Sequence, residues 1–322
     1  PQVFAKIDKI MLPKDYIAYK LSGNFATDVS DVSGTLYFDV ANRKYSQEML
    51  DILGIRKDQL PKVYESYEVV GTLLPNIQIE LKIEQEVKII IGGGDQAVGA
   101  VGVGIVGDGE CSISLGTSGV VFVSSETFNI DRKSYLQSYA HSNGKYHLMG
   151  VMLNAAGALK WWSEAIFKNY NYDEFFDKLN DVEIEDDLYF LPYLSGERSP
   201  LNDPNARGVF FGLRLEHRKC NMDRAVIEGV TYALRDSFEL IKNLDVPIAT
   251  IRLTGGGAKS EIWAQMIADI MNVNTVTIAV EEGPALGASI LAMVGCGEYQ
   301  TVEEACSNIV KLNKTFTPNK LN

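Results

Sequence analysis

The sequence predicts an α/β fold of two lobes, and three observations lead to this prediction. Segments with strand character alternate with helical segments along the chain. The 322 residues favour two domains over one. A stretch of small residues at 97–109 is echoed 188 residues later at 285–297, and a two-lobed protein needs such helices where its lobes meet.

The first 94 residues predict helices followed by short strands. Residues 1–60 have mainly helical character, and LPKDYIAYKLSG at 12–23 predicts a helix that ends at Gly23. The following segment, FATDVSDVSGTLYFDV, ends in a strand-like tail. VVGTLL at 69–74 and EVKIII at 86–91 predict short strands. We therefore expect residues 1–94 to belong to one lobe.

Residues 95–322 predict a second lobe in which strands and helices alternate. A small-residue helix follows Gly94, CSISLGTSGVVFVSS at 111–125 predicts two strands around a tight turn, and GALKWWSEAIF predicts an amphipathic helix. A longer helix at 222–244, a strand in TIRLTGGG and a helix at 260–271 follow. Hinge helices are expected near 95–107 and 284–295.

The echo between 97–109 and 285–297 has two interpretations. AVGAVGVGIVGDG and ALGASILAMVGCG share Ala, Gly, Ala, Val, Gly and Gly at aligned positions. Chance similarity between two small-residue helices is one interpretation. The other is a duplicated unit whose helices cross closely, because Gly and Ala let two backbones approach. The second interpretation predicts a hinge about which two lobes close.

The composition excludes several classes of function. The net charge of −12 argues against a nucleic-acid face, and the apolar runs are shorter than a membrane span. The four scattered cysteines indicate reduced thiols and a cytoplasmic protein. None of the three histidines has metal-ligand spacing. Carboxylates and hydroxyls therefore remain as candidates for any chemistry.

Three glycine loops share one design, in which a strand runs into glycines and then a polar residue. They are GGGDQ at 92–96, LGTSG at 115–119 and TGGGAKS at 254–260. Bare glycine amides can cradle an anion. One such loop is more often only a turn, but three together favour a nucleotide. GVGIVG at 102–107 is rejected as a dinucleotide motif because it is expected inside a helix and before a strand.

Asp95, directly after the three glycines, has two interpretations. As a structural residue it satisfies helix amides and suits the helix dipole. As a chemical group it is a mild base at the mouth of a cleft. Phosphoryl transfer needs little more than a carboxylate that orients the attacking hydroxyl.

Three segments resemble the FGGY carbohydrate kinases, within the actin-like ATPase superfamily. They are GVFFGLRLEHRKCNMDRAVIEG at 208–229, LPYLSGERSPLNDPNARG at 191–208 and residues 12–40. The resemblance implies an actin-like (ribonuclease H-like) two-lobed fold, with the C-terminal part of the sugar-binding lobe at 1–94 and the nucleotide-binding lobe at 95–322. It also implies Asp95 as the catalytic base and Asp95 and Gln96 as sugar contacts. The nucleotide contacts that it implies are Gly116 and Thr117 at the phosphates, Ala156 and Lys160 on a helix, and Gly256, Gly257 and Ser260 at the adenosine.

The activity implied by the resemblance is ATP-dependent phosphorylation of a pentulose, D-xylulose to D-xylulose 5-phosphate, with Mg²⁺ whose protein ligands are unassigned. Family members that act on ribulose, fuculose, gluconate or glycerol are alternatives. So are an actin-like ATPase without sugar kinase activity and an inactive binding remnant. A sugar and ATP are the expected partners, with neither nucleic acid nor membrane, and a homodimer is a further expectation.

One departure from the family pattern concerns the start of the chain. The family opens with a strand and a D-x-G-T/S-like phosphate loop, which is absent here. The expectation is therefore a fragment that lacks most of the N-terminal lobe, is clipped at its last helix and is inactive alone.

Overall fold

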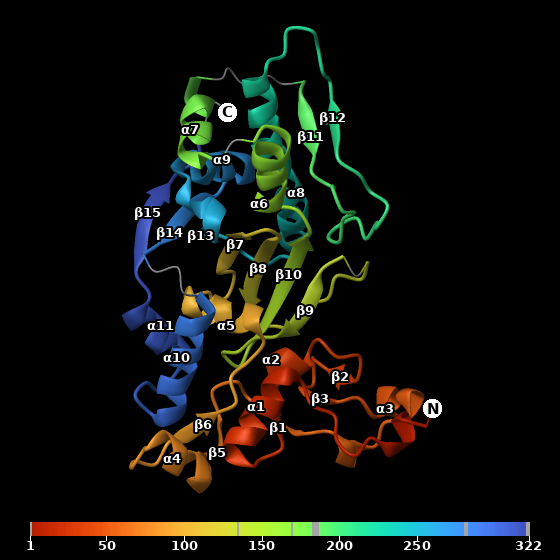
Figure 1. Ribbon diagram of the computed structural model, residues 1–322, viewed down its shortest axis with the longest axis vertical. Helices are drawn as coiled ribbons and strands as arrows, with labels where there is room; N and C mark the ends of the chain where they lie inside the picture. The colour runs from red at the N-terminus through yellow and green to blue at the C-terminus, as the bar shows by residue number, and fades with distance from the viewer. Residues whose placement is uncertain (1, 134, 169, 182–186, 280–282, 320–322) are drawn as a thin grey trace.

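The computed structural model describes residues 2–133, 135–168, 170–181, 187–279 and 283–319, and it shows an elongated molecule with an upper and a lower part (Figure 1). The helices are α1 (Pro13–Ser22), α2 (Val29–Val32), α3 (Gln47–Leu53), α4 (Pro75–Leu81), α5 (Asp95–Gly102), α6 (Ala156–Lys160), α7 (Tyr172–Asp177), α8 (Lys219–Lys242), α9 (Glu261–Met271), α10 (Gly283–Cys296) and α11 (Val302–Ile309). The strands are β1 (Ala26–Asp28), β2 (Phe38–Asp39), β3 (Lys44–Tyr45), β4 (Lys62–Tyr64), β5 (Val69–Thr72), β6 (Lys88–Ile90), β7 (Cys111–Leu115), β8 (Gly119–Ser125), β9 (Gln137–Ala140), β10 (Tyr146–Met152), β11 (Tyr189–Leu191), β12 (Val209–Phe211), β13 (Thr250–Thr254), β14 (Asn274–Ile278) and β15 (Leu312–Phe316).

The upper part is built on a seven-stranded mixed sheet with the order β15-β14-β13-β7-β8-β10-β9. Strand β13 is parallel to both β7 and β14, and its register sets Leu253 beside Ile113 and Thr277. Strands β7, β8, β10 and β9 pair antiparallel in succession. The two strands expected around the Gly-Thr-Ser-Gly turn are thus β7 and β8, which confirms that prediction.

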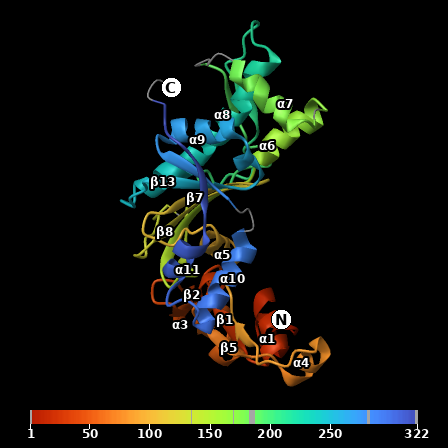
Figure 2. The same cartoon turned by 90° about the vertical axis from the view of Figure 1, so that its left-hand side faces the viewer.

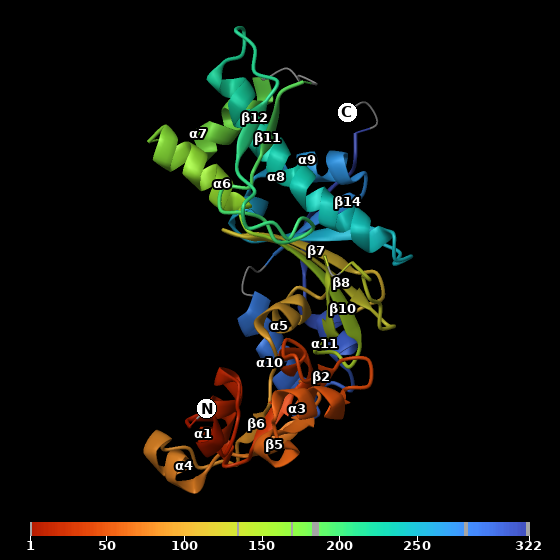
Figure 3. The same cartoon turned by 90° about the vertical axis from the view of Figure 1, so that its right-hand side faces the viewer.

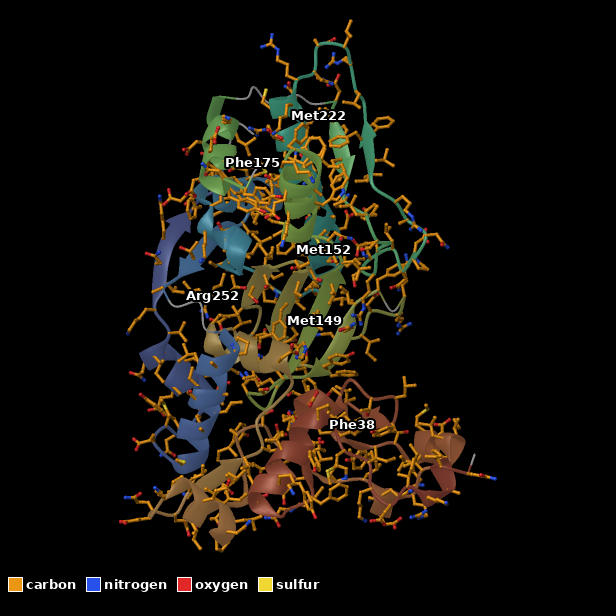
Figure 4. All side chains as sticks on the ribbon, in the orientation of Figure 1. Phe38, Met149, Met152, Phe175, Met222 and Arg252 are labelled. Carbon is orange, nitrogen blue, oxygen red and sulfur yellow. The ribbon has the colours of Figure 1, made fainter. Side chains whose placement is uncertain are left out.

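Helices cover both faces of this sheet (Figure 3). Helices α8 and α9 lie on the upper face, where Phe238, Trp263 and Ile267 are fully buried in a core shared with β7, β8 and β13. On the lower face, Val103 and Ile105, just beyond α5, pack against Phe122 and Met149. Met149 is labelled on the sheet in Figure 4. The sheet therefore separates the upper helices from α5, α10 and α11.

The lower part contains α1–α4 and β1–β6, and the chain starts there (Figure 2). Its core is small and divided into two clusters, one around Ala26, Val70 and Ile91 and the other around Val29, Val32 and Phe38. Helix α1 ends as predicted, because Gly23 adopts the left-handed φ of 75° that stops a helix. Segment 1–60 is less helical than predicted, since it contains strand β1 and the antiparallel pair of β2 and β3.

Helices α5 and α10 cross at backbone contact, which confirms the crossing expected from the echoed sequence. A Cβ atom at Gly102 would lie 1.8 Å from the Gly283 carbonyl oxygen, and one at Gly287 would lie 1.9 Å from the Val98 carbonyl oxygen. Only glycine fits at these two positions. The two helices therefore pack backbone against backbone at these glycines.

Helix α5 ends at Gly102, short of the predicted residue 107. The chain turns there because Gly104 adopts a φ of 75°, which a helix cannot contain. The GVGIVG segment therefore starts at the last helical residue and continues through a turn, so its expected place inside a helix is wrong. Helix α10 extends over Gly283–Cys296, close to the predicted 284–295.

Candidate active site

A cavity of about 930 Å³ opens in the upper part between the β7–β8 turn, α6, α7 and the start of α9. Its lining includes all seven residues expected to contact a nucleotide: Gly116, Thr117, Ala156, Lys160, Gly256, Gly257 and Ser260. They come from three segments far apart in the sequence. The fold brings them together around one space that is large enough for a drug-sized ligand.

The glycines after β13 have different roles in shaping this cavity. Gly255 has a φ of 81°, and a Cβ there would lie 2.8 Å from the Leu115 carbonyl carbon. Gly257 packs against the ring of Trp263, where a Cβ would lie 2.8 Å from a ring carbon. Gly256 differs, because nothing lies within 4 Å of its Cβ position. Gly255 and Gly257 let the loop pack, and Gly256 borders open space.

The β7–β8 turn is fixed to the start of α6. The Ala156 amide donates to the Gly116 carbonyl over 2.9 Å, and the Gly157 amide donates to the Thr117 carbonyl over 3.1 Å. These bonds satisfy amides at the start of α6 and hold the turn against that helix. Thr117 and, one helical turn beyond Ala156, Lys160 are exposed there.

Helix α7 supplies cavity residues that sequence reasoning missed, among them Tyr172, Asp173 and Phe176. The Tyr172 hydroxyl donates to Glu164 Oε1 over 2.7 Å, and burial together with this carboxylate raises the pKa of Tyr172 to about 12. Phe176 is tilted against Trp263 at a centroid distance of 6.2 Å. No motif marks these residues, and only the amphipathic pattern of 172–177 could have indicated a packed helix.

Asp95 and Gln96 begin α5 and are both exposed. Asp95 Oδ1 accepts a hydrogen bond from the Gln96 amide over 2.8 Å. Its other oxygen makes no hydrogen bond within the described ranges. One carboxylate oxygen thus serves the helix start, and the group keeps an acceptor facing outward.

The glycines before Asp95 allow close packing against serines. A Cβ at Gly93 would lie 2.6 Å from both Ser30 Oγ and Ser142 Oγ. Gly92 has a φ of 71°, which favours glycine. These contacts, and not only the approach of a ligand, account for two of the three glycines.

Other carboxyl groups lie close to Asp95. Asp31 on α2 is half-buried, and its Oδ1 lies 3.7 Å from the Cβ position of Gly94. Burial raises the pKa of Asp31 to about 6, an effect that Lys14 opposes and that Asp28, Asp15 and Asp95 reinforce. Sequence reasoning did not single out Asp31. The structure therefore offers a second carboxyl group, whose pKa is raised, beside the expected base.

Lys14 partly neutralises this acidic region. Its Nζ lies 2.7 Å from Asp15 Oδ1 and 3.0 Å from Asp28 Oδ1, and both carboxylates are buried.

Among the described residues, no three His, Cys, Asp or Glu side chains are grouped to share a metal ion. Within the same ranges, no helix is both long and apolar enough to cross a bilayer.

Comparisons with known proteins cover the whole chain. The FGGY family of carbohydrate kinases matches with its N-terminal domain over residues 1–102 and its C-terminal domain over residues 111–296. A xylulose kinase of Escherichia coli is 41% identical over 307 residues, which are 94% of this chain and 63% of that protein. The match to the N-terminal domain does not support a mostly missing first lobe, nor the inactivity expected from it.

Solved structures agree with the fold. A ligand-bound xylulose kinase and a gluconate kinase, both from Lactobacillus acidophilus, each superpose with a TM-score of 0.93 at 33% identity. Each comparison covers 99% of this chain and 65% of the other chain. The chain thus spans slightly less than two thirds of the length of these relatives.

Proposed function

Because the chain belongs to the FGGY family of carbohydrate kinases, we propose that the protein transfers the γ-phosphate of ATP to a primary hydroxyl of a pentulose. The proposed reaction converts D-xylulose to D-xylulose 5-phosphate, as the names of relatives such as the Escherichia coli protein favour. One observation carries the proposal: seven residues chosen from sequence as nucleotide contacts line one cavity.

In this proposal ATP occupies the 930 Å³ cavity. Gly256 has open space where a side chain would be, so adenosine can lie against the backbone between it and Ser260. The turn at Gly116 and Thr117 lies across the cavity and offers exposed backbone and a hydroxyl to phosphate oxygens. Lys160 adds the positive charge that an anionic ligand needs in a chain of net charge −12.

Asp95 is proposed as the base that orients the sugar hydroxyl and takes its proton. The carboxylate is exposed, and its bond to the Gln96 amide holds one oxygen. The transition state of phosphoryl transfer is loose, and the hydroxyl loses its proton late. The base therefore needs correct position more than basicity. Gln96 follows Asp95 at the same surface and is proposed as a second sugar contact.

Mg²⁺ is proposed to arrive with the nucleotide. The described residues contain no group of three donors that would hold a resident ion. Mg²⁺ in kinases needs only one or two protein carboxylates, because phosphate oxygens and water complete its coordination. When bound, the ion would neutralise charge that develops on the phosphates.

We further propose that residues 1–94 belong to the C-terminal part of the sugar-binding lobe and residues 95–322 to the nucleotide-binding lobe, with α5 and α10 as the hinge. The backbone contact between these helices supports the proposal, because it gives two lobes a narrow axis. A cytoplasmic location is proposed from the unpaired cysteines.

A homodimer is proposed through the outer face of the β11–β12 ribbon. Its exposed side chains are Tyr189, Leu191, Val209 and Phe211, and the register sets Tyr189 opposite Phe211 and Leu191 opposite Val209. Such a continuous apolar face often marks an interface. Light scattering should show a dimer for the parent protein and a monomer for Phe211→Ser. A monomeric parent protein would contradict this proposal.

The activity is tested by a coupled ADP assay with a panel of acceptors. D-xylulose should give the highest kcat/KM, above ribulose, fuculose, gluconate and glycerol. Preference for another acceptor would move the assignment within the family, where the similar gluconate kinase structure makes gluconate the first rival. ADP release that is independent of every sugar would instead support an actin-like ATPase.

A further inference from the structure

Helix α5, which carries Asp95, is held at both ends by side chains from other segments. Before its first residue, the Gly94 amide donates to Ser30 Oγ over 3.0 Å. Beyond its last turn, the Ile105 carbonyl lies 2.7 Å from His141 Nε2, and the Val106 carbonyl accepts from Asn143 Nδ2 over 2.7 Å. The helix is therefore fixed along its axis by groups outside itself.

Ser30 joins three segments at the start of the helix. Its hydroxyl donates to Asp28 Oδ2 over 2.5 Å, because a carboxylate can only accept. Its lone pairs then accept from the Gly94 amide and, over 3.2 Å, from Ser142 Oγ. Ser30 is 5% exposed and Asp28 is fully buried beside Lys14. The position of this hydroxyl is therefore fully determined by its partners.

His141 acts at the other end, and its contacts define its tautomer. The Ser142 amide donates to His141 Nδ1 over 2.7 Å, so Nε2 carries the proton and donates to the Ile105 carbonyl. Burial lowers the pKa of His141 to about 4, so the ring is neutral at physiological pH. An imidazolium could not accept from the Ser142 amide.

We propose that Ser30 and His141 are positioning residues, which fix the two ends of α5 and thereby place the Asp95 carboxylate against the sugar. Ser142 links them, since its amide bonds to His141 and its hydroxyl to Ser30. The proposal rests on the proposed role of Asp95 as the base. That carboxylate is exposed and, among the contacts of the described residues, bonds only within its own helix start, so its place depends on where the helix lies.

Ser30→Ala tests the first contact, with Ser66→Ala as a matched control. Ser66 is fully buried, donates to the same Asp28 Oδ2 over 2.8 Å and lies with its Oγ 3.4 Å from Ser30 Oγ, but its hydroxyl does not bond to Gly94 among the described contacts. Both variants remove one buried hydroxyl from Asp28. A displaced catalytic group can cost up to about 100-fold in rate. We therefore expect Ser30→Ala alone to lower kcat by about 10- to 100-fold, with KM for ATP unchanged.

His141→Phe tests the second contact, and His147→Phe is its control. The two rings lie 5.7 Å apart in the same core, but neither nitrogen of His147 has a hydrogen-bond partner in the described part of the chain. We expect only His141→Phe to lower kcat. His141→Gln should restore much of it, because an amide can both accept and donate.

Hydrogen exchange of the α5 amides provides a readout that does not depend on activity. Ser30→Ala and His141→Phe should accelerate exchange across residues 95–103, while Ser66→Ala and His147→Phe should not. Unchanged α5 exchange, or equal kcat losses in each variant and its control, overturns the positioning proposal. Retained activity in Asp95→Asn would instead refute the proposed role of Asp95 as the base. The exchange result would then decide by itself whether Ser30 and His141 hold α5 in place.

Discussion

Asp95→Asn separates the two interpretations of Asp95, because it removes the charge and keeps the shape. In the variant, Asn Oδ1 can still accept from the Gln96 amide, which donates to Asp95 Oδ1 over 2.8 Å in the parent protein. The helix start loses only a favourable charge, which is about 0.3–1 kcal/mol at an exposed site. The unfolding free energy should therefore fall by less than about 1 kcal/mol.

The effect on the reaction should be far larger. Removal of a general base costs about 10²–10⁴-fold in rate, or roughly 3–5.5 kcal/mol of barrier. ATP affinity should stay within about twofold, since the cavity lining contains no residue of α5. The paired assay is sugar phosphorylation by ADP coupling and ATP affinity by calorimetry. A role as helix cap alone predicts nearly unchanged kcat.

Asp31→Asn is the control that the structure adds to this experiment. Asp31 is the neighbouring carboxyl group whose pKa of about 6 suits a base near neutral pH. We expect Asp31→Asn to keep more of kcat than Asp95→Asn. If Asp95→Asn retains more than about a tenth of wild-type kcat and Asp31→Asn does not, the base is Asp31 and the assignment of Asp95 is refuted.

Three further predictions concern binding and stability. Gly256→Val should raise KM for ATP much more than KM for the sugar without loss of stability, because its Cβ meets nothing within 4 Å; equal changes in both KM values would count against the nucleotide assignment. Asp31→Asn should stabilise the protein above pH 6 and not at pH 3.5. The folded-state pKa of Asp31 is raised from 3.8 to about 6, so its stability contribution is lost as the pH rises through that range. A pKa difference of this size corresponds to ~3 kcal/mol of unfolding free energy, which solvent screening of the half-buried group reduces to about 1–2 kcal/mol. Urea titration at the two pH values measures this gain. Gly102→Ala should cost at least about 1–3 kcal/mol, because its Cβ would lie 1.8 Å from the Gly283 carbonyl oxygen; thermal melting compares it with Gly256→Ala, and equal melting temperatures would contradict the close crossing.

Local sequence signals were sufficient for the parts of the cavity that glycine builds. The pattern of a strand that runs into glycines predicts both the turn at 115–119 and the loop at 254–260, and residues of both line the cavity. The reason is physical: left-handed and close-packed backbone, as at Gly255, leaves few residue choices. The echo of small residues likewise predicted the crossing of α5 and α10.

The remaining features depend on tertiary packing, which sequence patterns do not record. Tyr172 and Phe176 reach the cavity only because α7 lies against Trp263 and Glu164. Strands β1 and β4 have three residues each, which is too short to show an alternating pattern. Asp31 has a raised pKa because the fold buries it next to Gly94. The residues around it in the sequence do not indicate that burial.

The small residues after Asp95 follow from what α5 has to connect. Helix α5 begins beside Ser30 in the lower part, and the segment just after the helix packs on Phe122 of β8. The turn that leads into β8 borders the cavity. The proposed base and the proposed phosphate turn are therefore related through a single short helix and one strand. Because α10 contacts the α5 backbone directly at Gly102, neither helix can shift sideways without a clash. If α5 and α10 act as the proposed hinge, the lobes move by rotation about this contact, and that rotation changes the position of Asp95 relative to Thr117. A substitution at the crossing should accordingly lower kcat by more than its loss of folded protein explains.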